Sequence, residues 1–163
     1  MASDPRKRRS DFNLSNRSHP IKNCQKDETY EKLHSWIGDS EESNWTEYST
    51  ELVAKSVLID FKNQQWERLE QEILQKPEYW QQRSAVSFGE DRTEQAIKLL
   101  KLLLSSSCYK DVKIIATYEL DWAEVPIEKK YAPFIRELIE TTPIDEIEPE
   151  LNRLLAKAEA AEN

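Results

Sequence analysis

Glycine, histidine and cysteine are scarce in this chain, which has only two of each among its 163 residues. Antiparallel sheets need many turns with positive φ angles, and glycine supplies them, so this scarcity argues against an all-β fold. The chain is instead rich in Leu, Glu, Lys and Gln, which are strong helix formers. The composition therefore predicts an all-α protein.

Long apolar runs and a cysteine framework are also missing. The most apolar stretch, around 102–104, is interrupted by Lys98 and Lys101 and stays well below the ~18 residues that a membrane span needs. The N-terminal residues carry positive charge but no apolar segment of the kind found in secretory signals. Cys24 and Cys108 form no C-x-x-C pattern, and nothing about them requires an oxidising compartment. We therefore expect a cytoplasmic protein that does not contact membranes.

Side chains for catalysis and metal binding are few. Neither His19 nor His34 has a carboxylate, cysteine or second histidine at the spacing of metal ligands, so we expect no metal site. The chain has no G-x-G-x-x-G sequence, no phosphate-binding loop and no nucleophile elbow. We expect no catalytic residues, no cofactor and no small-molecule substrate.

Charge is distributed unevenly along the chain. Residues 1–22 carry a net charge of +4, whereas the whole chain carries −8, so residues 23–163 carry −12. An acidic surface repels phosphate backbones and attracts basic proteins. We therefore expect a basic protein partner and no nucleic-acid binding through residues 23–163. The basic run at 6–9 leaves open a role in nuclear import or nucleic-acid contact.

The pattern of apolar residues divides the chain into two regions. Residues 1–25 are polar, basic and aperiodic, which predicts a disordered tail. Residues 26–163 show helical periodicity, which predicts a single helical domain of antiparallel neighbours joined by short connections. The expected helices span about 30–37, 45–61, 65–75, 78–88, 92–104, 110–121, 126–141 and 147–158.

Local signals predict how several of these helices begin, end and pack. Asn44 is a good N-cap for the second helix, on which Trp45, Tyr48 and Leu52 form one apolar line. Val53 and Val57 continue to Phe61 as a second apolar line. Trp36, Trp66 and Trp80 are also expected in the core, as is Trp45.

Further along the chain, Gly89 is expected to end the fourth helix and Asp91 to cap the fifth. The helix at 92–104 is apolar nearly all round, which predicts that it is central and buried. Pro126 is expected to open the seventh helix, and Pro133 to kink or split it.

Two segments of the chain are similar to each other. The stretch 80–89, W-x-x-R-x-A-x-x-x-G, aligns with 111–120 at a spacing of 31 residues, which places Ala85 over Ala116. A small residue at mid-helix allows a neighbouring helix to approach closely, and a repeat favours a short α-solenoid of stacked hairpins over a bundle. Residues 77–121 resemble HEAT repeats, although 31 residues is short for that family and no repeat is evident before residue 77. The resemblance predicts HEAT-like repeats centred on 77–141.

The run I-L-Q-K-P-E-Y-W-Q-Q-R-S-A at 73–85, with the size and composition of the chain, resembles small bacterial immunity proteins. These include the inhibitors that protect cells from toxins of contact-dependent growth inhibition systems. The resemblance implies a tight stoichiometric complex with a cognate toxin domain, often a nuclease, and no catalytic activity. The alternative is a helical adaptor that uses its basic N-terminal tail for nuclear import or nucleic-acid contact.

The reversals of the chain predict where the partner binds. The turns at 62–64, 89–91 and 121–125 should lie at one edge of the stack, and those at 105–108 and 142–145 at the other. An acidic ridge with Trp122 as an exposed aromatic anchor at the first edge would suit the basic active-site surface of a toxin. Helix capping and interaction with helix dipoles are the alternative role of its carboxylates. The candidate partner-binding residues are Glu90, Asp91, Glu94, Asp121, Trp122, Glu124 and Glu128.

Overall fold

The computed structural model of the protein describes residues 27–162, and the predicted tail at 1–25 lies outside the described residues. Within this range the chain forms eight α-helices and no strands, which confirms the predicted all-α fold. The helices are α2 (Glu28–Ile37), α3 (Glu47–Ser56), α4 (Asn63–Glu72), α5 (Glu78–Asp91), α6 (Glu94–Ser106), α7 (Lys110–Trp122), α8 (Ala132–Glu140) and α9 (Pro149–Ala160). Short 3₁₀ turns, η1 (Leu58–Asp60), η2 (Ile73–Gln75), η3 (Lys129–Tyr131) and η4 (Ile144–Glu146), occupy several of the connections.

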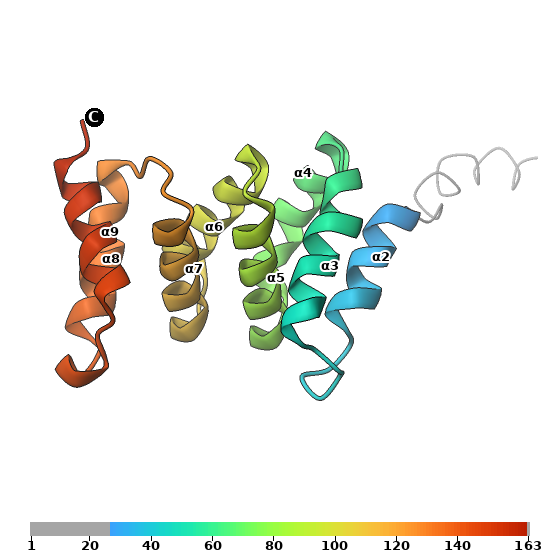
Figure 1. The fold of residues 1–163 in the computed structure, drawn as a ribbon, viewed down its shortest axis with the longest axis horizontal. Helices are drawn as coiled ribbons and strands as arrows, with labels where there is room; N and C mark the ends of the chain where they lie inside the picture. Colours follow the sequence, from blue (N-terminus) through green and yellow to red (C-terminus); the bar gives the residue numbers. More distant parts are fainter. Residues whose placement is uncertain (1–26, 163) are drawn as a thin grey trace, which may run out of the picture.

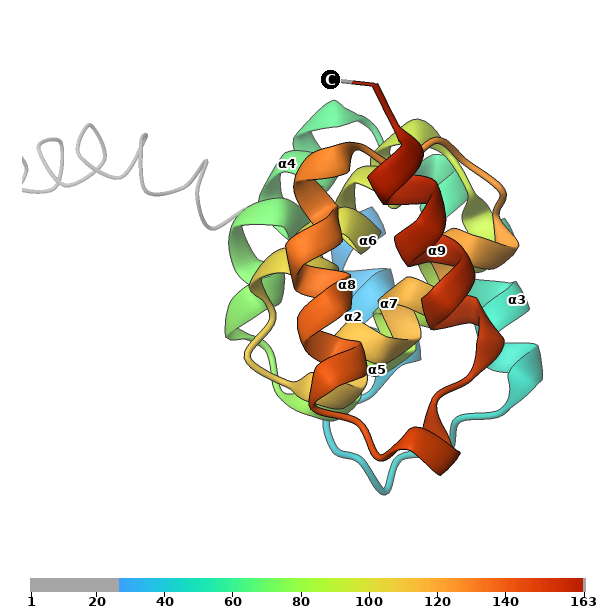
Figure 2. The ribbon, with the colours of Figure 1, turned by 90° about the vertical axis from the view of Figure 1, so that its left-hand side faces the viewer.

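Consecutive helices run antiparallel and stack in two rows (Figures 1 and 2). The helices α3, α5, α7 and α9 lie side by side in one row, with α4, α6 and α8 behind them and α2 beside α3 at the end of the stack. We call the row of α3, α5, α7 and α9 the front row and the row of α4, α6 and α8 the back row. The first three helices of the front row begin at Glu47, Glu78 and Lys110, so their starts are 31 and 32 residues apart. The regular spacing therefore begins before residue 77, where the amino-acid sequence shows no repeat.

The core is one apolar cluster that extends from Tyr30 in α2 to Ala158 in α9. Ala85 and Ala116 are fully buried within it, on the two helices whose contact is the most extensive in the fold. This burial agrees with the close approach that their small side chains predict.

The most enclosed helix is α5, not the expected helix at 92–104. It packs against α3, α6 and α7, and it buries four polar residues, Gln81, Arg83, Ser84 and Ser87. The helix α6 buries its apolar face but leaves Lys98 exposed. A hydropathy pattern treats polar residues as surface residues. It therefore misses a central helix in which Gln81, Arg83 and Ser87 form hydrogen bonds inside the protein.

Arg83 is the main buried partner of the α2–α3 connection. Its Nη1 donates to the carbonyl oxygen of Ile37 at 2.6 Å and to Oγ of Ser43 at 2.9 Å, and its Nη2 donates to the carbonyl oxygen of Glu41 at 2.9 Å. The guanidinium also lies over the rings of Trp45 and Tyr79, 5.5 and 5.0 Å from their centroids. One side chain on α5 thereby holds a loop some 40 residues earlier in the chain.

The boundary between α5 and α6 differs from the expected one. Gly89 lies inside α5, which continues to Asp91 and ends at Arg92 in the left-handed conformation, with φ of 59°. A Cβ at residue 89 would overlap the carboxylate of Glu119, so glycine serves the contact between α5 and α7 and not the helix end. The N-cap of α6 is Thr93, whose side chain accepts from the backbone N–H of Ala96, and Asp91 accepts from Thr93 instead of capping.

The second predicted helix also differs from the structure. Its N-cap is Thr46 and not Asn44, and its expected line at Tyr48 and Leu52 is exposed, at 71% and 40%. The line at Val53 and Val57 is fully buried and Phe61 is 9% exposed, as expected. The helix α3 packs against α2 and α5, and neither of them covers the line at Tyr48 and Leu52.

The two prolines near α8 have other places than expected. Pro126 lies in the connection between α7 and η3, before any helix begins. Pro133 lies in the first turn of α8, where the missing N–H needs no partner, so it neither kinks nor splits that helix. The described helices include none with the length and apolarity that a membrane span requires.

Candidate partner-binding surface

The three connections α3–α4, α5–α6 and α7–α8 lie at one end of the stack, at the top of Figure 1, as the chain reversals predict. We call this end the upper edge. All seven candidate residues lie at or next to it. The structure divides them between the front row and the back row, because α7 ends in the front row whereas α6 begins in the back row.

Trp122 is the last residue of α7 and is 50% exposed. Its ring stacks on Tyr118, with centroids 5.8 Å apart and an interplanar angle of 29°. Its Nε1–H donates to Oε2 of Glu150 on α9 at 3.0 Å. The indole is therefore held on two sides while its remaining surface faces solvent, and a side chain fixed in this way loses little entropy on binding.

The four tryptophans that were expected in the core differ in their burial. Trp66 and Trp80 are buried, Trp45 is half-buried and Trp36 is 37% exposed.

Asp121 and Glu128 are already engaged by cations. Asp121 accepts from Nε and Nη2 of Arg153 at 3.1 and 2.7 Å, and its side chain is only 12% exposed. Glu128 accepts from Nζ of Lys101 at 2.6 Å, and this hydrogen bond lowers the pKa of Glu128. The partners are 32 and 27 residues away in sequence, so the chain reversals alone do not reveal them.

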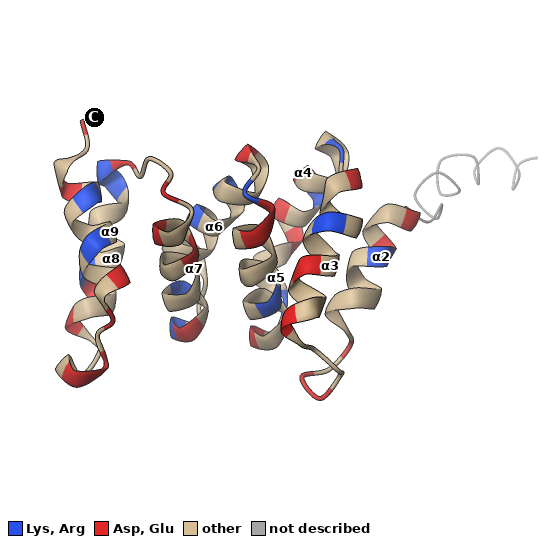
Figure 3. Ribbon diagram, viewed as in Figure 1, with Lys and Arg blue, Asp and Glu red and all other residues tan. Residues whose placement is uncertain are grey.

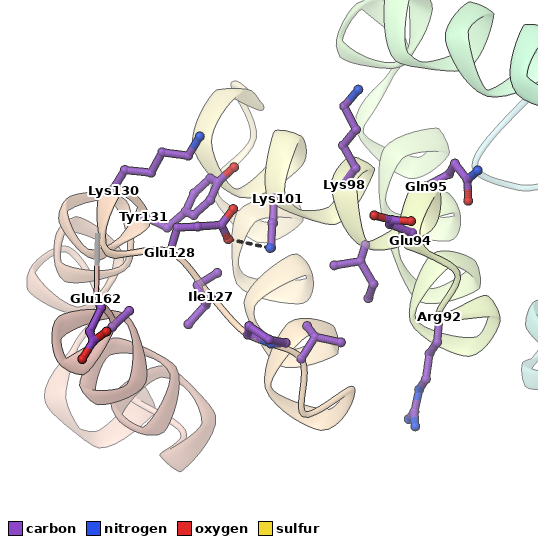
Figure 4. A pocket seen from close by; sticks show the side chains of 14 residues that line it. Arg92, Glu94, Gln95, Lys98, Lys101, Ile127, Glu128, Lys130, Tyr131 and Glu162 are labelled. Atoms are coloured by element: carbon purple, nitrogen blue, oxygen red, sulfur yellow. Dashed lines mark hydrogen bonds and ion pairs between the residues drawn. The ribbon is translucent and has the colours of Figure 1, made fainter.

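Glu94 and Glu128 line a groove of about 970 Å³ behind the front row (Figure 4). Its apolar floor includes Ile97 and Ile127, and its walls come from α6, the α7–α8 connection and the end of the chain near Glu162. Four cations line it, Arg92, Lys98, Lys101 and Lys130, against the three carboxylates of Glu94, Glu128 and Glu162. This part of the upper edge is thus not acidic. Lys98 and Lys101 follow Glu94 by four and seven residues, so they lie on the same face of α6 as Glu94. This spacing is visible in the sequence, but the prediction of an acidic ridge did not take it into account.

Glu90, Glu94 and Glu124 are exposed and form no ion pair within residues 27–162. Glu124 takes the left-handed conformation, with φ of 56°, directly after α7. Asp91 is half-buried and accepts hydrogen bonds from the backbone N–H and the hydroxyl of Thr93. Figure 3 shows segments coloured red for Asp and Glu along the upper edge. Four of the seven residues of the expected ridge, Glu90, Asp91, Glu94 and Glu124, therefore carry a negative charge that no ion pair within residues 27–162 neutralises.

Sequence reasoning missed Glu119, which lies on α7 beside Gly89. Its Oε2 is buried and has no hydrogen-bond partner. Burial raises the pKa of Glu119 to about 7, while the nearby charge of Arg92 lowers it and that of Glu90 raises it further. The one sequence signal is the glycine opposite, because a helix-interior glycine marks a position where another group approaches closely.

The other side chains that could bind a metal ion or take part in catalysis are the histidines, the cysteines and clusters of acidic residues. No group of three or more His, Cys, Asp and Glu side chains within residues 27–162 is placed to hold a metal ion. His34 packs between the rings of Tyr30 and Trp80, and burial lowers its pKa. Cys108 is exposed, and Cys24 and His19 lie outside the described residues.

No known family model matches the chain, and no curated protein or solved structure is detectably similar to it.

Proposed function

We propose that this chain is an immunity protein that binds a cognate protein toxin and blocks its basic active-site surface. The toxin is proposed to be a nuclease, since nucleases use basic surfaces to hold phosphate backbones. The observation that carries the proposal is Trp122, a half-exposed indole fixed by Tyr118 and Glu150 at an edge with free carboxylates.

The physical chemistry of this edge suits a basic protein. A fixed aromatic side chain is a typical centre of binding energy in protein interfaces, where it fills a pocket and is shielded from water. The exposed carboxylates of Glu90 and Glu124 supply charge that speeds the approach of a cationic surface. The net charge of −12 on residues 23–163 acts over a longer range in the same direction.

An immunity gene lies directly after the gene of its toxin. The proposal is therefore tested with the C-terminal domain of the large protein that is encoded directly upstream. We expect the full chain to form a 1:1 complex with that domain and to abolish its toxicity in co-expression. Trp122→Ala should raise the dissociation rate about 30-fold, equivalent to ~2 kcal/mol of binding. Trp36→Ala, which truncates an exposed indole on α2, is the matched control and should change the rate less than about threefold.

Two results would contradict the proposal. One is an upstream gene product that is not toxic or does not bind the wild-type chain. The other is a complex in which Trp122→Ala and Trp36→Ala have equal effects, which would place the toxin elsewhere on the molecule.

A further inference from the structure

The outer side of α3 carries three large apolar side chains that the fold leaves uncovered. Tyr48 is 71% exposed, Leu52 is 40% exposed, and Ile59 in η1 is 68% exposed. Tyr48 and Leu52 are four residues apart and lie on one face of α3, and Ile59 follows in η1, after α3 has ended at Ser56. The opposite face already buries Val53 and Val57 completely, so the three exposed side chains contribute little to the core.

These side chains belong to a surface that continues across the front row. We call this surface the open face, the side of α3, α5, α7 and α9 that turns away from α4, α6 and α8 (Figure 1). The helix spacings of 31 and 32 residues make Ile59, Glu90 and Trp122 equivalent positions on α3–η1, α5 and α7. All three are exposed. The apolar strip on α3 therefore lies on the same face as the aromatic anchor on α7.

The packing of α3 against α5 supports this alignment. The pKa of Lys55 on α3 is raised chiefly by its hydrogen bond with Glu51, at 2.7 Å, and also by the charge of Glu90 on α5. The helices α3 and α5 also pack directly against each other along their boundary. The open face is continuous at this boundary.

The charge of the open face selects among possible occupants. On α3 and α5, Lys55 pairs with Glu51, which leaves Glu47 and Glu90 exposed and without an ion-pair partner in the described part of the chain. A second copy of this chain would bring another strongly acidic body against these carboxylates and be repelled. A protein with an apolar ridge flanked by Lys or Arg has the opposite sign and the matching surface.

The size of the open face fits a specific protein interface. Helices that pack ~8–10 Å apart give a row of four a width of roughly 25–30 Å, and helices of this length are about 15–20 Å long. The face is thus on the order of 500 Å² in projection, and larger once the relief of its side chains is counted. One partner in a stable complex buries ~800 Å².

The geometry points to the open face as the docking surface of the basic protein partner, with Tyr48, Leu52 and Ile59 forming a second contact region beside Trp122. This inference rests on the proposed function, because it assigns a further surface to the same partner. It differs from the ridge expected from the sequence, because Glu94 and Glu128 in the groove behind the front row lie outside the contact.

The experiment combines Tyr48→Ala, Leu52→Ala and Ile59→Ser in the full chain and measures binding to the upstream-encoded toxin domain. We expect the dissociation constant to rise at least about tenfold, with an unchanged melting temperature, because the three side chains are exposed. Ile144→Ser is the matched control, since Ile144 is 89% exposed at the opposite edge and should bind as wild type does.

Charge variants separate the open face from the groove. Glu47→Lys on α3 should slow association and reduce its dependence on salt, whereas Glu94→Lys in the groove should leave both unchanged. The same carboxyl-to-ammonium change is made in both, and both residues are exposed in the first turn of a helix.

Each outcome decides between the two proposals. Unchanged binding of the triple variant, with binding lost in Trp122→Ala, overturns the open-face inference and leaves the proposed function in place. Failure of the wild-type chain to bind the toxin domain removes both. Sedimentation of the purified wild-type chain as a dimer that the triple variant dissociates would show that a second copy covers the strip, which also overturns the inference.

Discussion

Replacing the buried carboxyl of Glu119 with an amide tests how α5 and α7 pack. Glu119 keeps its proton in the folded protein up to a pKa of about 7, whereas its ordinary value is 4.5. Between these values the unfolded chain releases the proton and the folded chain does not. The stability that Glu119 contributes is therefore fully present below about pH 4.5 and is lost as the pH rises toward 7.

The size of this loss follows from the pKa change. A rise from 4.5 to about 7 corresponds to at most ~3 kcal/mol. Because Glu119 is only half-buried and part of its carboxyl reaches solvent, we reduce the expected value to ~1–2 kcal/mol. Glu119→Gln places a neutral group of nearly the same shape there, so the variant should not suffer this loss.

The assay is urea unfolding of wild type and Glu119→Gln between pH 4 and 8.5. The variant should gain ~1–2 kcal/mol relative to wild type as the pH rises from 4.5 to 7.5 and then gain no more. The difference between the proteins cancels the titration of all other groups. Glu90→Gln, an exposed neighbour, is the control and should stay within about 0.5 kcal/mol of wild type throughout. A difference for Glu119→Gln that is flat or falls with pH would refute the burial of this carboxyl.

Three further substitutions test the packing by equilibrium unfolding. Arg83→Ala should cost ~3 kcal/mol, because it removes the guanidinium that holds the α2–α3 connection, and Arg83→Lys should recover less than half, since one ammonium cannot reach both carbonyl oxygens; a loss below about 1 kcal/mol would contradict this role. Leu100→Ala should cost ~2–5 kcal/mol through lost burial and the cavity left behind, and a cost below about 1 kcal/mol would mean that α6 is not packed as described. Gly89→Ala should be destabilising in wild type but neutral or stabilising in a Glu119→Ala background, with a coupling of ~1 kcal/mol or more, and additive effects would show that the two residues do not touch.

Much of the candidate surface follows from the sequence because it depends on local rules. Helical periodicity and short connections fix the direction of each helix, and direction alone decides which turns share an edge. That reasoning correctly places the α3–α4, α5–α6 and α7–α8 connections at one edge, although residues 89–91 lie inside α5 and not in a turn. It also leaves Trp122 exposed at the end of its helix. The buried pair Ala85 and Ala116 is likewise anticipated by the repeat.

Which charges on that surface are paired could be learned only from the tertiary structure. The pairing of Asp121 with Arg153, and of Glu128 with Lys101, joins residues 32 and 27 positions apart. A charged residue on a helix end looks the same in sequence whether it is free, capping a helix or paired across to another helix. Only the placement of neighbouring helices decides which carboxylates remain available to a partner.

Burial of polar groups and exposure of apolar ones were also decided by tertiary contacts. Periodicity shows that α3 has two apolar lines, but it cannot show that neighbours cover Val53 and not Tyr48. Composition marks Arg83 and Glu119 as surface residues, yet α5 and α7 lie where other helices enclose them. The sequence by itself determined the helices and their directions, because hydrogen bonding within a helix is local. The structure alone determined what each side chain meets, because burial depends on residues that are remote in the chain and adjacent only in space.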